Sequence, residues 1–121
     1  MSIPLHITQT NKPNGKVAEV RVEFFVGYVP STAIITSKEA RWFIDNETAY
    51  FFTKIAGTSE PVPVTKYGDD SIRSLKNNDD DDNLLNLPDI GIEPGIRPFY
   101  FRELQDWVKQ MGESLDLLPT F

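Results

Sequence analysis

Hydrophobic and charged residues alternate most clearly in the stretch 17–29, which predicts a β-strand. Val20, Val22 and Phe24 fall on one side of an extended chain, and the charged residues between them fall on the other. This period of two is typical of a strand with one buried face. The alternation ends after Phe24, and Gly27 is interpreted as a β-bulge within the same strand.

Four further stretches are predicted as strands. Residues 48–57 are rich in β-branched and aromatic side chains, and residues 62–67 form the next strand after a turn. Pro63 lacks a backbone N–H donor, which favours an edge position for the 62–67 strand. Shorter strands are predicted at 3–10 and 71–75.

The spacing of polar and apolar residues predicts two helices. The first spans 36–46, where Thr36 and Glu39 match a capping box, in which each side chain accepts a hydrogen bond from the other residue's backbone N–H. The second begins near residue 99 and has apolar residues at the i, i+3, i+4 and i+7 positions of one face: Leu104, Trp107, Val108 and Met111. Gly112 is predicted to end this helix.

These elements together predict an α+β fold in a single domain, residues 1–121. We expect a small antiparallel sheet of three to five strands, with one short helix and a C-terminal amphipathic helix. Residues 1–90 are expected to form the sheet-rich core with an acidic loop at 76–96. Residues 97–121 are expected to form the C-terminal helix and tail.

The net charge of −6 is concentrated in residues 69–93. That segment has eight acidic and two basic residues, whereas the rest of the chain has ten of each. A neutral body with one acidic segment disfavours direct binding of that surface to nucleic-acid phosphates. Four consecutive aspartates form the centre of the acidic segment: Asp79, Asp80, Asp81 and Asp82.

Three interpretations of the aspartate run are open: a solvated loop, an acidic surface that binds a basic partner, or a cation site. The cation site is disfavoured because consecutive side chains point in different directions. A calcium-binding loop instead spaces its acidic residues and places a glycine among them.

Leu84, Leu85 and Leu87 follow the aspartates directly. In one interpretation they plug the open end of the sheet, and Pro88 fixes the exit of the chain. In the other, they form an exposed short motif that docks into a groove of a partner. A related sequence, LDLLPTF, closes the chain and is compatible with either interpretation.

The segment DNLLNLPDI follows a predicted order of strand, short helix, strand, glycine turn and strand. This order and this ending resemble domain-of-unknown-function family 3892, a group of small, mostly bacterial proteins with an Asn-Leu-x-Asn-Leu-Pro motif. The resemblance covers residues 17–90, and a helix and tail extend this chain beyond the motif. The family has no established activity, so the resemblance implies a fold and no chemistry.

Composition excludes several chemistries. The chain has no cysteine, and His6 is its one histidine, so disulfides, cysteine nucleophiles and histidine triads or clusters are excluded. None of the glycines forms a phosphate-binding loop. No catalytic residue, metal site or cofactor is therefore predicted. Aromatic clusters at 24–28, 49–52 and 98–101 are interpreted mainly as core, with some rings and Trp107 exposed in a protein-binding or dimer patch.

The sequence favours a small non-enzymatic protein-interaction module that uses the acidic loop and the NLLNLP motif. The candidate partner-binding residues are Asp79, Asp80, Asp81, Asp82, Leu84, Leu85, Leu87 and Trp107. One alternative is an acidic decoy from a phage or bacterium that blocks a basic nucleic-acid-binding site. Another is an enzyme that uses carboxylates or a bound metal. A homodimer is left open, and the lack of a signal peptide and of a long apolar stretch predicts a cytoplasmic protein with no membrane partner.

Overall fold

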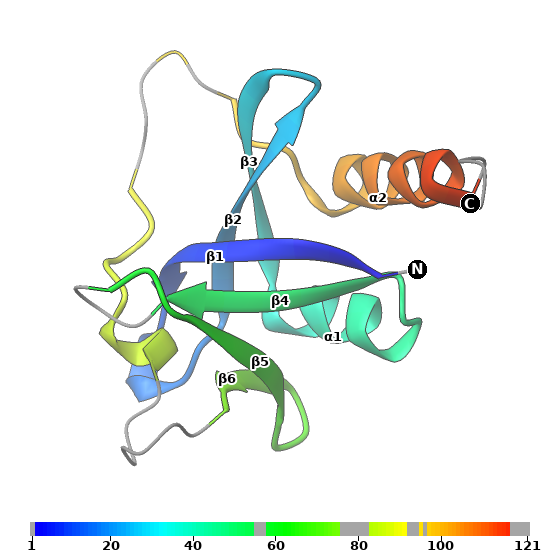
Figure 1. Cartoon of the computed structure of the whole chain (residues 1–121). Helices are drawn as coiled ribbons and strands as arrows, with labels where there is room; N and C mark the ends of the chain where they lie inside the picture. Colours follow the sequence, from blue (N-terminus) through cyan, green and yellow to red (C-terminus); the bar gives the residue numbers. More distant parts are fainter. Residues whose placement is uncertain (1, 55–57, 76–82, 92–94, 96, 117–121) are drawn as a thin grey trace.

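The computed structural model describes residues 2–54, 58–75, 83–91, 95 and 97–116. These residues form six strands and two α-helices: β1 (Ile3–Asn11), β2 (Glu19–Val26), β3 (Val29–Thr36), α1 (Ser37–Asp45), β4 (Ala49–Lys54), β5 (Pro61–Tyr67), β6 (Ser71–Ser74) and α2 (Phe101–Asp116). They also include two short 3-10 helices, η1 (Pro13–Gly15) and η2 (Asn83–Asn86). The strand order is β3-β2-β1-β4-β5-β6 (Figure 1).

The predicted α+β class is confirmed, but the sheet is larger than predicted and is mixed. The described residues form six strands rather than three to five. β1 pairs with β4 in parallel, and every other neighbouring pair is antiparallel. The parallel pair arises because α1 carries the chain from β3, at one edge, back to the middle of the sheet, where β4 joins β1. Such a crossover connection places two strands in the same direction.

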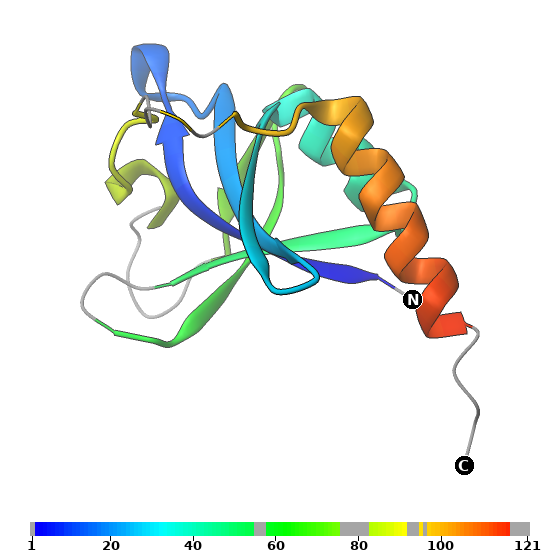
Figure 2. The ribbon, with the colours of Figure 1, turned by 90° about the horizontal axis from the view of Figure 1, so that it is seen from above.

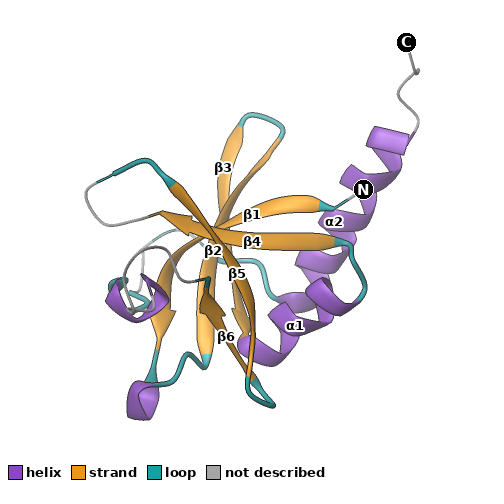
Figure 3. Ribbon diagram, turned by 60° about the horizontal axis from the view of Figure 1, so that its bottom comes forward, coloured by secondary structure: helices purple, strands orange, loops and turns teal. Residues whose placement is uncertain are grey.

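The sheet is strongly twisted, and α1 contacts both of its edge strands, β3 and β6 (Figure 3). Two serine hydroxyls fix this arrangement at one end. Ser37, at the start of α1, and Ser71, at the start of β6, both donate hydrogen bonds to the Val17 carbonyl, at 2.7 and 2.9 Å. The core therefore lies on the side of the sheet that α1 covers.

Alternation along the strands determines which side chains enter the core. Leu5 of β1 and Phe51 of β4 are buried, and the Phe51 ring lies 6.2 Å from the ring of Phe43 on α1. Their strand neighbours Pro4 and Tyr50 are exposed on the opposite face. The sheet thus has one face that packs on the core and one that faces outward.

The predicted first helix is confirmed together with its capping box. The Thr36 hydroxyl accepts a hydrogen bond from the Glu39 backbone N–H at 3.1 Å, and the Glu39 carboxylate accepts one from the Thr36 N–H at 2.8 Å. Asn46 is the C-cap residue, as predicted.

The interpretation of Gly27 as a bulge is wrong. Gly27 has a φ of 63° and begins a two-residue hairpin loop between Val26 and Val29, which are paired. A hairpin loop of this length requires positive φ, which glycine adopts without strain. β3 is an additional strand that the sequence does not predict, because Pro30 and the mixed polar residues leave it without clear alternation.

Two further predictions about element ends and edges are wrong. Pro63 is not in an edge strand, because β5 lies between β4 and β6. Its N-terminal half pairs with β4 and its C-terminal half with β6, so Pro63 sits where the pairing changes partner. Gly112 does not end α2, which continues to Asp116. A glycine inside a helix lowers helix stability by only about 1 kcal/mol relative to alanine. The packed face of a long helix can offset this loss.

The second helix packs through the face that its spacing predicts. Leu104 and Val108 are buried, and Trp107 is half-buried with its ring 4.6 Å from the ring of Phe24 on β2. Figure 2 shows α2 along one side of the molecule, next to α1 and β3, which agrees with the contact of Phe101 with Trp42. Met111 remains 37% exposed at the edge of this face.

Candidate functional site

The segment that follows the aspartate run is fixed to the sheet by a buried leucine. Leu84, in η2, has no exposed surface and belongs to the hydrophobic core. η2 contacts β1, β4 and β6. The Thr10 hydroxyl of β1 donates a hydrogen bond to the Leu84 carbonyl at 2.9 Å. Residues 83–91, here called the anchored segment, therefore begin with a plug at one end of the sheet.

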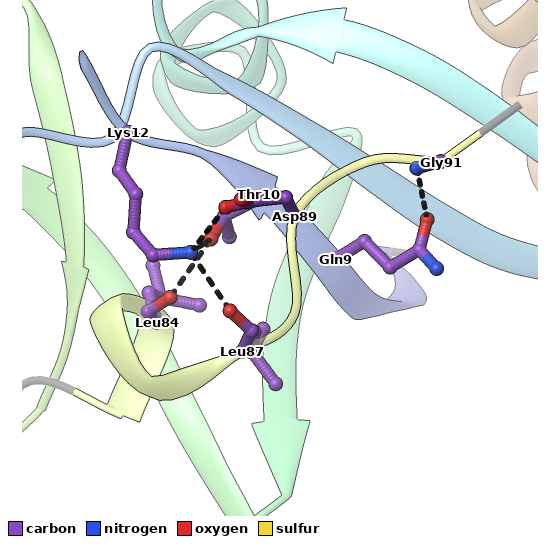
Figure 4. Close-up of polar contacts among 7 residues, drawn as sticks. All are labelled: Gln9, Thr10, Lys12, Leu84, Leu87, Asp89 and Gly91. Carbon is purple, nitrogen blue, oxygen red and sulfur yellow. Dashed lines mark hydrogen bonds and ion pairs between the residues drawn. The ribbon is translucent and has the colours of Figure 1, made fainter.

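Lys12 holds the next part of the anchored segment (Figure 4). Its ammonium donates to the Leu87 carbonyl at 2.7 Å, to the Thr10 hydroxyl at 3.2 Å and to the Asp89 carboxylate at 3.1 Å. The Thr10 backbone N–H donates to the Pro88 carbonyl at 3.0 Å. β4 pairs with β1 only as far as His6. The anchored segment lies beside the remaining part of β1, which β4 does not cover.

Two further contacts fix the end of the anchored segment. The Gly91 N–H donates to the Gln9 side-chain oxygen at 3.3 Å, and the Arg21 guanidinium donates to the Gly91 carbonyl at 2.7 Å. Arg21 is only 4% exposed. Side chains and backbone of β1 and β2 thus hold this segment along its length.

The structure separates the candidate partner-binding residues of the sequence analysis. Leu84 is fully buried, as the plug interpretation predicts, which leaves none of its surface for a partner. Leu87 is half-buried against the core, and Leu85 is 37% exposed. Trp107 packs on Phe24, so it does not form the centre of an exposed patch. Asp79, Asp80, Asp81 and Asp82 lie outside the described residues.

A second surface, which the sequence analysis did not single out as a site, is formed by rings on the outward face of the sheet. Its members are aromatic, imidazole or proline residues from five adjacent strands, and we call it the ring face: Pro4, His6, Phe25, Pro30, Tyr50, Phe52, Pro61 and Pro63. Phe25 is 62% exposed and Tyr50 is 50% exposed. Large apolar side chains with this exposure, gathered on one face, mark an interaction surface more often than a scattered exposed residue does.

Strand register explains why these rings lie together. His6 is directly opposite Glu23 on β2 and Phe52 on β4, and Phe52 is opposite Pro63 on β5. Residues opposite one another in neighbouring strands point to the same face, with Cβ atoms about 5 Å apart. The rings of His6 and Phe52 are stacked, with centroids 4.9 Å apart and planes 4° from parallel.

The stacked pair separates two shallow hollows. One, of about 570 Å³, is lined by Pro4, Tyr50 and Phe52 together with Lys54 and the two prolines of β5. The other, of about 370 Å³, is lined by His6 and Glu23 together with Phe25 and Pro30 to Thr32. Each hollow therefore combines apolar rings with one charged side chain.

The surroundings of His6, at the centre of the ring face, favour the neutral form of its imidazole. Burial lowers the pKa of His6 below its ordinary value, and the positive charge of Lys54 lowers it further, while Glu23 raises it. A neutral imidazole is compatible with close stacking on Phe52 and with an apolar ligand.

The pKa of His6 predicts how stability depends on pH. In the unfolded chain His6 has a pKa of about 6.5, so it takes up a proton there at a higher pH than it does in the folded protein. The free energy of unfolding should therefore fall as the pH is lowered below about 6.5. Urea unfolding at pH 7.5 and pH 5.5 measures this fall, which should be smaller in His6→Gln. An equal fall in both proteins would show that His6 does not contribute.

Within the ranges that the structure describes, no three His, Asp or Glu side chains are grouped so that they could hold a metal ion. Among the same residues, no helix has the length and apolar character needed to cross a membrane.

Comparison with family models, with curated proteins and with solved structures finds no match to this chain.

Proposed function

We propose that this protein is a non-enzymatic protein-interaction module that binds its partner through the ring face. The observation that carries the proposal is the gathering of exposed rings from five adjacent strands around the stacked His6–Phe52 pair. The function class is the one that the sequence predicts, but the main binding surface is the outward face of the sheet rather than the acidic loop and the NLLNLP motif.

The chemistry of the ring face supports binding. Tyrosine, phenylalanine and proline side chains have few rotatable bonds, so they lose little conformational entropy when a partner immobilises them. They also sit on strands whose other face is packed into the core, which holds their backbone in place. A rigid apolar surface binds with a smaller ordering cost than a flexible one.

The anchored segment has a supporting role in this proposal. Its buried Leu84 and the contacts of Lys12 fix the part of the chain that follows the aspartate run and precedes α2. Contact of Asp79 to Asp82 with a basic region of the same partner stays a prediction, as does the resemblance to domain-of-unknown-function family 3892.

Site-specific photo-crosslinking tests the proposal. Tyr50 and Tyr67 are 50% and 52% exposed, but Tyr67 lies at the far end of β5, where that strand pairs with β6. The photoreactive amino acid p-benzoylphenylalanine is placed at one or the other position, and the protein is irradiated in extract of the cells that naturally contain it. We expect a discrete protein adduct from position 50 that is weak or missing from position 67. Equal adducts from both positions, or none from position 50, would refute the proposal.

A further inference from the structure

We infer that the ring face binds an extended, proline-containing peptide segment that carries a basic and an acidic residue about four positions apart. This inference rests on the proposed function and specifies its partner. Three features of the ring face lead to it: the size of the exposed surface, the two hollows, and the positions of Glu23 and Lys54.

The size of the ring face favours a peptide over a second folded protein surface. Phe25 and Tyr50 are 62% and 50% exposed. An aromatic side chain has a surface of about 150–250 Å², so each contributes on the order of 100 Å², and the whole face comes to roughly 500 Å². A standard interface between two folded proteins buries about 800 Å² on each partner. The rings alone fall short of that area, which favours a short segment over a second copy of this chain.

The shape of the ring face suits a polyproline II helix. The stacked rings of His6 and Phe52 lie between the two hollows, since His6 lines one hollow and Phe52 lines the other. A polyproline II helix has three residues per turn, so prolines two positions apart lie on two adjacent edges that can face the same surface. Its backbone is already ordered before binding. Aromatic-lined grooves recognise such segments because prolines fill the hollows at a small entropic cost. The Tyr50 hydroxyl supplies a donor for a peptide carbonyl, since polyproline II has no internal hydrogen bonds.

The charges of the two hollows define the flanking residues of the ligand. Glu23 lines one hollow and Lys54 lines the other, and both are exposed. Glu23 is opposite His6, and His6 is opposite Phe52, so two strand spacings separate Glu23 from β4. With Lys54 two residues farther along β4, neighbouring strands about 4.8 Å apart and a rise of about 3.3 Å per residue, the two positions are roughly 12 Å apart.

That separation corresponds to about four residues of polyproline II, which rises about 3.1 Å per residue. A basic residue of the ligand then lies over Glu23 and an acidic residue over Lys54. Because polyproline II presents similar surfaces in both chain directions, either order of the two charges along the peptide can satisfy this arrangement.

Fluorescence anisotropy with labelled synthetic peptides tests the inference. The probe is the capped peptide AARPLPEAA, in which arginine and glutamate are four positions apart around two prolines. We expect it to bind with a Kd below about 1 mM. The peptide AARGLGEAA, which lacks the prolines, should bind roughly tenfold more weakly, and AAAPLPAAA, which lacks the charges, should bind about three- to tenfold more weakly.

Variants of the protein locate the binding site. Tyr50→Ala should weaken binding of the probe at least about tenfold, as expected for an aromatic residue at the centre of an interface. Tyr67→Ala is the matched control and should leave binding unchanged. Lys54→Glu changes an exposed residue, so the variant should stay folded. It should weaken binding of AARPLPEAA and strengthen binding of AARPLPRAA, which restores the opposite charges.

The outcomes separate the inference from the proposed function. If position 50 yields a protein adduct but none of the peptides binds, the proposed function stands and the peptide inference is wrong. The inference is also wrong if the proline-free peptide binds as well as the probe. It is equally wrong if Lys54→Glu does not weaken binding of AARPLPEAA and strengthen binding of AARPLPRAA. A dimer in sedimentation analysis that Tyr50→Ala abolishes would replace the peptide with a second copy of the chain.

Discussion

Replacing Leu84 with alanine should lower the free energy of unfolding by about 2–5 kcal/mol, the range for leucine-to-alanine changes at fully buried positions. Leu84 has no exposed surface, and η2 contacts three strands that are far apart in the sequence. Its loss would leave a cavity between those strands, and a rigid sheet can close such a cavity only partly. Urea unfolding of the two proteins at neutral pH measures the difference.

Leu85→Ala is the matched control for this prediction. Leu85 is the next residue in the same short helix and is 37% exposed, so its loss should cost about 1 kcal/mol or less. Both changes remove the same atoms from the same sequence motif. Similar losses in the two variants would contradict the plug interpretation of the NLLNLP motif, because a docking motif gives no reason for unequal stability effects.

Elements with local signals could be predicted from the sequence. α1 was found because Thr36 and Glu39 satisfy each other's backbone groups within four residues, a contact that the sequence contains in full. The packed face of α2 followed from the spacing of Leu104 and Val108. The core face of β2 followed from the alternation of Val20 and Val22, which are buried.

Pairing between distant segments could not be predicted in this way. β1 and β4 pair in parallel through residues more than forty positions apart, and no local pattern specifies that partner. β3 has alternating burial at Ala33 and Ile35, but Pro30 and its hydroxyl residues obscured it. The edge of β3 is also covered from a distance, since the Phe99 N–H donates to the Thr32 carbonyl at 2.8 Å.

The ring face was missed because its strands carry rings on both faces. In β4, Tyr50 and Phe52 point outward while Phe51 between them is buried. Hydrophobicity alone does not distinguish these positions, so the cluster was interpreted mainly as core. A usable signal was present in β5, where Pro61 and Pro63 alternate with Val62 and Val64. In this strand the exposed prolines lie on the outward face and the buried valines on the core face.

Lys12→Met should lower the free energy of unfolding by about 1–3 kcal/mol, the cost of leaving buried polar groups without a donor. The Lys12 ammonium donates to the Leu87 carbonyl and to the Thr10 hydroxyl, and its side chain is 21% exposed. Its ion pair with Asp89 adds little, because the Asp89 side chain is 86% exposed. Methionine keeps most of the aliphatic stem, so the loss reports the hydrogen bonds.

Hydrogen exchange shows where the effect of Lys12→Met is located. The Thr10 N–H donates a hydrogen bond to the Pro88 carbonyl of the anchored segment. The Ile34 N–H instead donates to the Phe99 carbonyl, at the β3 edge of the sheet. The free energy of opening should fall more at Thr10 than at Ile34, because the anchored segment detaches before the sheet unfolds. Lys38→Met, at an exposed position of α1, is the control and should change neither amide. Equal falls at Thr10 and Ile34 would mean that Lys12 stabilises the fold as a whole and does not hold the anchored segment in particular.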